Sequence, residues 1–290
     1  MKFGINNPAF LQAAGNRVVS TAFFIEALDD CEFDLTLSKL GDFSENLEFS
    51  FDGGEHWIAP NLSAGYMLSK NQRLLIRNKT KVDFDYTQPD SRPFANIGVN
   101  YKIGGDLIRL FYPNQLPDSG FRMFFLDDEY LSDASQLELR IKEVPRSFFE
   151  DMFNGCVSLV AAPELPATTI GYSGYGKMFS GCENLAVAPQ LPALTLNNWC
   201  YSEMFKDCVS LKAAPELPAT ILVNNCYALM FDGCSQIDKV TCLAENIPNP
   251  NCTTNWLRDV AAEGTFTKAA GVDWPEGVSG IPTGWTVIEQ

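Results

Sequence analysis

The residues able to do chemistry are few, and their spacing does not assemble a catalytic site. His56 is the single histidine, which argues against a histidine-based metal site and against a Ser-His-Asp triad. Residues 171–177 (GYSGYGK) approach the phosphate-binding pattern GxxxxGK[ST], but Met178 stands where the magnesium-binding hydroxyl belongs. We therefore expect no phosphate loop, and we expect His56 to be structural.

Two groups of carboxylates have a chemical interpretation and a simpler one. Residues 127–129 (Asp-Asp-Glu) offer several oxygens of the kind that calcium prefers. Asp83 and Asp85 share one face of an expected strand, where paired carboxylates can do acid-base work. A solvated loop and a solvated strand face explain them more simply and are expected. The sequence thus predicts no catalytic residue, no metal site and no cofactor, and the protein is not expected to be an enzyme.

The chain has nine cysteines, of which eight lie in the second half. No CxxC pair is present, so a zinc knuckle or a thioredoxin-like motif is unsupported. Two alternatives stay open. Disulfides within a coil are feasible only for the 200/208 and 226/234 pairs. A buried ladder of free thiols, with a cysteine at the same place in each coil, is favoured.

The cysteine spacing belongs to a 26-residue repeat. Met-Phe pairs recur at 152, 178, 204 and 230, each followed by a cysteine at 156, 182, 208 and 234. The run AAPELPAT (161–168) returns as VAPQLPAL (187–194) and AAPELPAT (213–220). A fixed period in the range of about 20–50 residues predicts a solenoid, in which stacked coils bury the apolar side that one coil alone leaves exposed.

Each coil can be divided into a short helix and an extended segment. Residues 200–208 (CYSEMFKDC) are expected to be helical, with Met204 and Phe205 pointing inward. The prolines in 210–218 forbid a helix and limit ladder hydrogen bonds there. Leu211 and Leu217 are separated by an even number of positions, so both should point to the core.

The outward positions of the coils are the candidate partner-binding residues. Small alanines make this surface shallow, and polar side chains alternate with the buried leucines. Tyr172 and Trp199 lie at the adjacent turn, where they either anchor a partner or pack on the next coil. The candidate residues are Glu164, Gln190, Lys212, Glu216, Tyr172 and Trp199.

The fold class expected is mainly β with short helices. Alternating residues and turn signals, such as LEFSFDGGEHWI at 47–58, predict an antiparallel β-sandwich over 20–115. The rest divides into an arm or first strand at 1–19, a connector at 116–146, a leucine-rich-repeat solenoid at 147–256 and a C-terminal cap at 257–290.

Composition narrows the possible partners. The chain has 290 residues and a formal net charge of −15, which argues against binding nucleic acid or an anionic membrane surface. The sequence has no apolar run of the roughly 18 residues that a membrane span needs, so no membrane insertion is expected. The N-terminal residues lack the apolar core of a secretory signal, so export by the usual route is not expected.

The repeats resemble the BspA-type leucine-rich repeat proteins of gut bacteria and their phages. The family pattern CYxxMFxGCxSLxxAPxLPATxL is matched at 174–196, 200–222 and 226–237, and the ending SGIPTGWTV (279–287) is also similar. The resemblance implies a leucine-rich-repeat fold, no catalytic residues, and binding to other proteins or host surfaces. The missing signal and the small number of repeats depart from the bacterial members and suit a phage protein.

The resulting expectation is a non-enzymatic phage virion protein of the tail, a fibre or the head decoration, made in the host cytoplasm. Its N-terminal β domain would anchor it, and its solenoid would bind a neighbouring virion protein or a host-surface protein or glycan. It would belong to a larger assembly, and a homo-oligomer is one form of this. The alternative is a bacterial cell-surface adhesin of the same repeat family.

Overall fold

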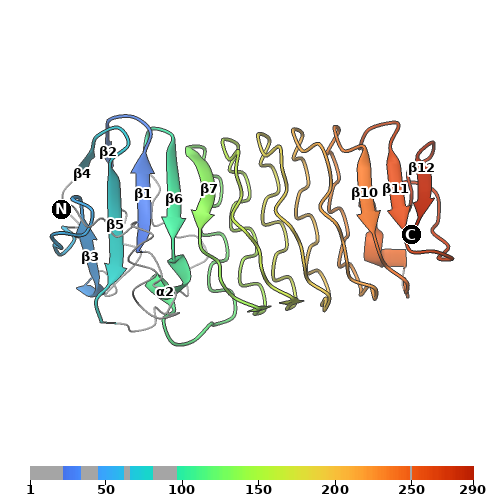
Figure 1. Cartoon of the computed structure of the whole chain (residues 1–290), viewed down its shortest axis with the longest axis horizontal. Coiled ribbons are helices and arrows are strands. Elements are labelled where there is room, and N and C mark those ends of the chain that lie inside the picture. The colour runs from blue at the N-terminus through green and yellow to red at the C-terminus, as the bar shows by residue number, and fades with distance from the viewer. Residues whose placement is uncertain (1–21, 34–44, 62–65, 81–96, 249) are drawn as a thin grey trace.

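The computed structural model describes residues 22–33, 45–61, 66–80, 97–248 and 250–290. In these ranges the protein is mainly β, with several small sheets, none of them closed. The helices that lie wholly within these ranges are α2 (Leu107–Phe111) and the short 3-10 helix η3 (Pro250–Thr253). The elements follow one another along one long axis, from the N-terminal sheet through the repeats to the C-terminal strands (Figure 1). The expected arm at 1–19 lies outside the described residues.

The N-terminal half is built on one five-stranded sheet of order β3-β5-β1-β6-β7. Its strands are β1 (Phe23–Ala27), β3 (Leu47–Ser50), β5 (Arg73–Asn78), β6 (Tyr101–Gly105) and β7 (Leu131–Leu137). The first four pair antiparallel, whereas β6 and β7 run parallel. A parallel pair needs a long crossover, which α2 and the chain leading to β7 supply.

This sheet differs from the expected antiparallel sandwich over 20–115. The described strands of that range form the first four strands of a mixed sheet, together with a separate two-stranded ladder of β2 (Cys31–Phe33) and β4 (Tyr66–Leu68). The fifth strand, β7, comes from the expected connector at 116–146. Of the expected hairpin at 47–58, the first strand forms as β3, but the return is a single bridge in which Phe49 and Ile58 exchange two backbone hydrogen bonds of 2.9 Å.

The Met-Phe segments of the repeats are not helical, and this part of the prediction is wrong. Alternate amides of each segment bond in different directions. The Met152 amide donates to Phe149 O of its own unit, and the next amide, that of Phe153, donates to Met178 O of the following unit. In an α-helix every amide would bond within the segment. The backbone is instead a succession of tight turns that is hydrogen-bonded to the next unit at every second residue.

This backbone path places left-handed residues at every fourth position. In the unit that begins near 199, Trp199, Glu203 and Asp207 have φ values of 64°, 56° and 60°. The equivalent last position in two neighbouring units is Gly181 or Gly233, which adopt such values without steric cost. A non-glycine residue there is held by the hydrogen bonds to the units on both sides, because its own steric preference opposes the conformation.

The side chains of successive units form continuous ladders in the core. One ladder stacks the rings of Phe125, Phe153, Phe179, Phe205 and Phe231 at 5.4–5.7 Å between centroids. A second runs from Phe149 through Tyr175, Tyr201 and Tyr227 to Trp256. Met204 and Phe205 are fully buried, as are Leu211 and Leu217, so their inward orientation is confirmed.

The stack of units begins earlier than the repeat pattern indicates. Phe125 lies in the expected connector, yet its amide donates to Met152 O and its ring stacks on Phe153. The step in the sequence from Phe125 to Phe153 is longer than the step from Phe153 to Phe179, so the fixed period does not detect this unit. The segment 119–128 is therefore structured as a unit of the stack.

The C-terminal residues extend the stack with a parallel sheet. Its strands are β10 (Lys239–Cys242), β11 (Thr265–Lys268) and β12 (Thr286–Glu289), in that order. A smaller parallel pair, β8 (Glu143–Val144) and β9 (Thr169–Ile170), links the expected connector to the first full unit. Trp256 is fully buried and stacks on Trp274 at 5.4 Å, so residues after 256 cover the end of the core.

The ring ladder predicts a large cost for removing one ring. Phe205→Ala should lower the free energy of unfolding by about 3–5 kcal/mol, because it deletes a fully buried ring that stacks on two neighbours. Val209→Ala, at a half-exposed position of the same unit, should change it by no more than about 0.5 kcal/mol. Chemical denaturation of the full chain measures both, and equal values would contradict the ladder.

Candidate binding surface

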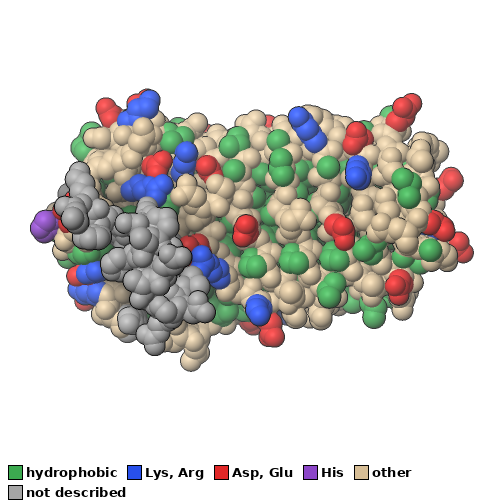
Figure 2. Space-filling view, viewed as in Figure 1, with side chains coloured by type: hydrophobic (Ala, Val, Ile, Leu, Met, Phe, Trp, Pro, Cys, Tyr) green, Lys and Arg blue, Asp and Glu red, His purple; other side chains and the backbone are tan. Residues whose placement is uncertain are grey.

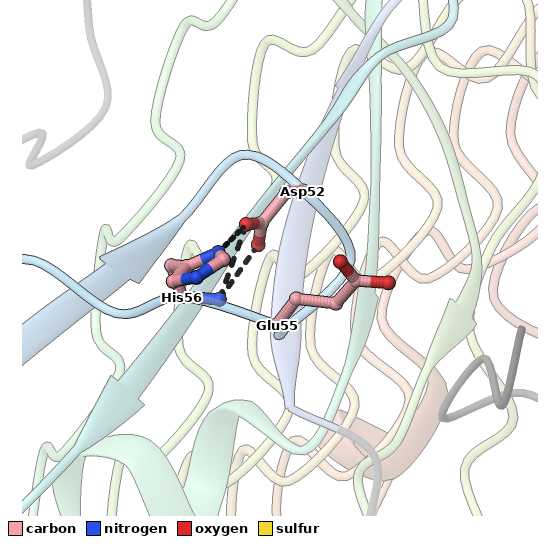
Figure 3. Close-up of side chains that lie close together, drawn as sticks. All are labelled: Asp52, Glu55 and His56. Atoms are coloured by element: carbon pink, nitrogen blue, oxygen red, sulfur yellow. Dashed lines mark hydrogen bonds and ion pairs between the residues drawn. The ribbon is translucent and has the colours of Figure 1, made fainter.

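The turn that carries the single histidine gathers three possible metal ligands. Asp52, Glu55 and His56 are all exposed, and one ligand atom of each lies within 4.8 Å of the others (Figure 3). Asp52 accepts hydrogen bonds from the His56 amide (3.0 Å), from Ser50 Oγ (2.7 Å) and from His56 Nδ1 (2.6 Å). These donors, the His56 amide first, hold the pKa of Asp52 well below its usual range. The contacts close the turn between Phe49 and Ile58, which is the structural role expected of His56.

The other chemical candidates also have structural partners. Asp128 accepts hydrogen bonds from the amides of Tyr130 and Leu131 at 3.0 Å and from the buried Tyr101 hydroxyl. Burial, with the nearby Asp128 carboxylate, raises the pKa of Tyr101. Met178 is fully buried in the stack, and 171–177 are turns of a unit rather than a loop before a long helix. Asp83 and Asp85 lie outside the described residues.

The nine cysteines are all free and buried. Those at 156, 182, 208 and 234 form one ladder, in which each Sγ lies 2.9–3.2 Å from a phenylalanine carbonyl oxygen of the preceding unit. Burial raises the pKa of Cys200, Cys234 and Cys242 to about 12 each. The thiols therefore act as small core side chains that also donate to the backbone, as the ladder interpretation predicts.

The predicted binding residues occupy two parts of the stack surface. Glu164, Gln190 and Glu216 are exposed and stand at equivalent positions of three successive units. Lys212 is exposed as well but belongs to a different position of the repeat. Figure 2 shows one face of the stack, which carries hydrophobic and uncharged side chains with scattered charged ones between them.

The two aromatic candidates lie at the turns of the units. Tyr172 is 36% exposed, and the Arg146 guanidinium lies 4.4 Å from its ring centroid. Trp199 is 38% exposed and adopts a left-handed backbone conformation. Both side chains are partly covered by the protein itself and partly exposed. The structure therefore does not decide whether they anchor a partner or pack on the next unit.

Glu164 and Gln190 line a common groove. Its volume is about 270 Å³, and its other lining residues are small or apolar: Ala162, Pro163, Leu165, Pro166, Pro189 and Pro192. Within 97–248, which the structure describes without a gap, no amide of 162–167 or 188–193 donates a hydrogen bond to the chain. The inter-unit ladder resumes at the third unit, where Ala214 and Leu217 donate to β10. The groove thus lies where these inter-unit bonds are absent, although the third segment, which carries prolines at the same positions, does form them.

A larger groove of about 530 Å³ adjoins the first and shares Glu164 and Pro166 with it. Its lining includes Phe24 of β1, Leu75 of β5 and residues 135–140 at the end of β7. The sequence alone does not reveal this groove, because the sheet order β5-β1-β6-β7 brings together strands far apart in the chain. Its two arginines are paired, Arg73 with Glu26 and Arg140 with Glu138.

Charged side chains also link the units on the turn side of the stack. Arg122 Nε lies 2.9 Å from Glu150 Oε2, and Lys177 Nζ lies 3.6 Å from Glu203 Oε1. Asp151 is buried among these groups, and its burial raises its pKa, opposed by a hydrogen bond from Asn154. A raised pKa means that the fold disfavours the ionised carboxylate.

Comparison with known proteins returns no relative: no family model, no curated protein and no solved structure matches this chain. Among the described residues, the helices are too short to cross a membrane.

The thiol ladder predicts that reagents selective for thiolates will not label the folded protein. Thiols with a raised pKa stay protonated near neutral pH, and all nine side chains are buried. The folded chain should remain unlabelled. After denaturation with no reductant added, mass spectrometry of the intact chain should show nine labelled positions. Two or more bridges in the denatured, non-reduced chain would contradict the ladder.

The buried Asp151 predicts a pH-dependent effect of one substitution. Because its pKa is raised in the fold, ionisation costs stability as pH rises above the ordinary carboxyl value of 3.8. Asp151→Asn keeps a side chain that tolerates the left-handed backbone and removes the charge. The variant should melt above the wild type at about pH 7 and close to it at about pH 3. Asp207→Asn makes the same change at an exposed left-handed position. It is the matched control and should melt close to the wild type at about pH 7.

Proposed function

We propose that this protein is a non-enzymatic display and binding protein, and that its stacked units form a leucine-rich-repeat solenoid of the BspA type with a C-terminal cap. The observation that carries this proposal is the uninterrupted ring ladder from Phe125 to Phe231, with matching backbone hydrogen bonds between units. Such a ladder fixes the outward residues of every unit relative to one another.

A rigid surface favours binding because little conformational freedom is lost when a partner docks. The exposed residues Glu164, Gln190 and Glu216 repeat along one face at the spacing of the stacked units. The N-terminal sheet joins the stack through the parallel pairing of β6 with β7. We propose that this sheet anchors the protein and that the repeats carry the binding face.

We further propose that the anchored assembly is a phage virion, with a tail, fibre or head-decoration position. Nine free cysteines support assembly in a reducing cytoplasm, because a chain folding in an oxidising compartment would be exposed to incorrect pairing among them. The partner would be a neighbouring virion protein or a host-surface protein or glycan. The alternative, a bacterial cell-surface adhesin, has the same binding face and a different anchor.

Mass spectrometry of purified particles tests the location. In cultures that produce this protein, the intact 32.1 kDa chain should copurify with capsid or tail proteins in fixed stoichiometry. Its appearance in the outer-membrane or medium fraction of uninfected cells would overturn the virion proposal and favour the adhesin. The test should follow the full chain rather than the isolated repeats, because the pairing of β6 with β7 joins the N-terminal sheet to the stack.

A further inference from the structure

We propose that the groove between the first two proline-rich segments is the docking site for an extended, lysine- or arginine-bearing segment of a partner protein. This inference deepens the proposed binding function and rests on it. The site is lined by Ala162, Pro163, Glu164, Leu165, Pro166, Pro189, Gln190 and Pro192.

The shape of the groove suits an extended polypeptide. Its lining is mostly apolar, with four prolines, Ala162 and Leu165, and its volume of about 270 Å³ matches a short stretch of chain rather than a large ligand. It continues into the groove of about 530 Å³ through Glu164 and Pro166. Together the two grooves run across the strands, from the N-terminal sheet to the second full unit, so that a partner segment can cross several strands.

The main-chain amides of two lining residues make no hydrogen bond within the described chain. The amides of Glu164 and Gln190 donate to no group of the chain within 97–248, and both residues are exposed. Extended segments bind other proteins chiefly through main-chain hydrogen bonds, while side chains supply specificity. Main-chain donors therefore remain beside the apolar lining of this groove, whereas Ala214 and Leu217 of the third segment donate to β10.

The charge of the groove indicates a basic partner. Glu164 forms no ion pair within the described residues, in contrast to Arg73 and Arg140 of the adjoining groove, which are already paired with Glu26 and Glu138. Glu216 stands at the equivalent position two units further and likewise has no described ion pair. With a net charge of −15 on the whole chain, the available carboxylates select a cationic side chain at this site.

Selection from a random-peptide display library on the full-length protein tests the proposal without knowledge of the natural partner. Enriched peptides should contain more lysine and arginine than the unselected library, and their binding should weaken as salt rises. Glu164→Arg should lower their affinity about tenfold, because an attraction becomes a repulsion.

The matched control is Glu183→Arg, which makes the same change of charge at an exposed position outside both grooves. It should leave the affinity within about twofold of the wild type. Both variants should melt like the wild type, since both positions are exposed.

Three outcomes would overturn the docking site: no enrichment over the unselected library, enrichment of neutral or acidic peptides, or equal effects of the two substitutions. These outcomes are separate from failure of the proposed virion role. If the chain is absent from particles but the peptides behave as expected, the groove stands and the location is wrong. If the chain is present in particles but Glu164→Arg and Glu183→Arg behave alike, the location stands and the groove is wrong.

Discussion

The structure depends on backbone hydrogen bonds that alternate between a unit and its neighbour. Every second amide of a Met-Phe segment stays within its own unit, and the amides between them reach the next one, as Met152 and Phe153 illustrate. A single unit would leave half of these donors without partners, and unmade hydrogen bonds of buried backbone are costly. The ring and thiol ladders, the left-handed residues and the close stacking all follow from this arrangement.

Much of this architecture could be predicted from the sequence. The fixed period of the Met-Phe pairs identified the stacked units, and the even spacing of Leu211 and Leu217 correctly placed both in the core. Seven of the nine cysteines are explained by their register in the repeat, four at 156, 182, 208 and 234 and three at 200, 226 and 252. The ladder residues were placed correctly because like residues at a fixed period occupy like core positions. The two leucines were placed correctly because an even separation in an extended segment puts both side chains on one face.

What could not be predicted depends on contacts between segments distant in the chain or on an unusual backbone path. The segment CYSEMFKDC has the composition of a helix, but alternate amides of the segment form hydrogen bonds to the neighbouring unit. These bonds override its helical preference. Phe125 escaped notice because its separation from its stacking partner Phe153 does not match the period of the later units. The parallel pairing of β6 with β7 and the larger groove both arise from a strand order that the alternation of polar and apolar residues does not encode.

The spacing of the ladder residues along the chain changes only at the two ends of the stack. The step between stacked rings is constant from Phe153 to Phe231, but it is longer at the start, from Phe125 to Phe153, and at the end, where Tyr227 stacks on Trp256. The ends are thus distinct in sequence, while the interior is interchangeable. Recombination between the near-identical AAPELPAT copies would add or delete whole units in register, and it would leave both ends unchanged. The length of the stack can therefore vary in evolution in steps of one unit, about the 5.5–5.7 Å between stacked interior rings, without redesign of either end.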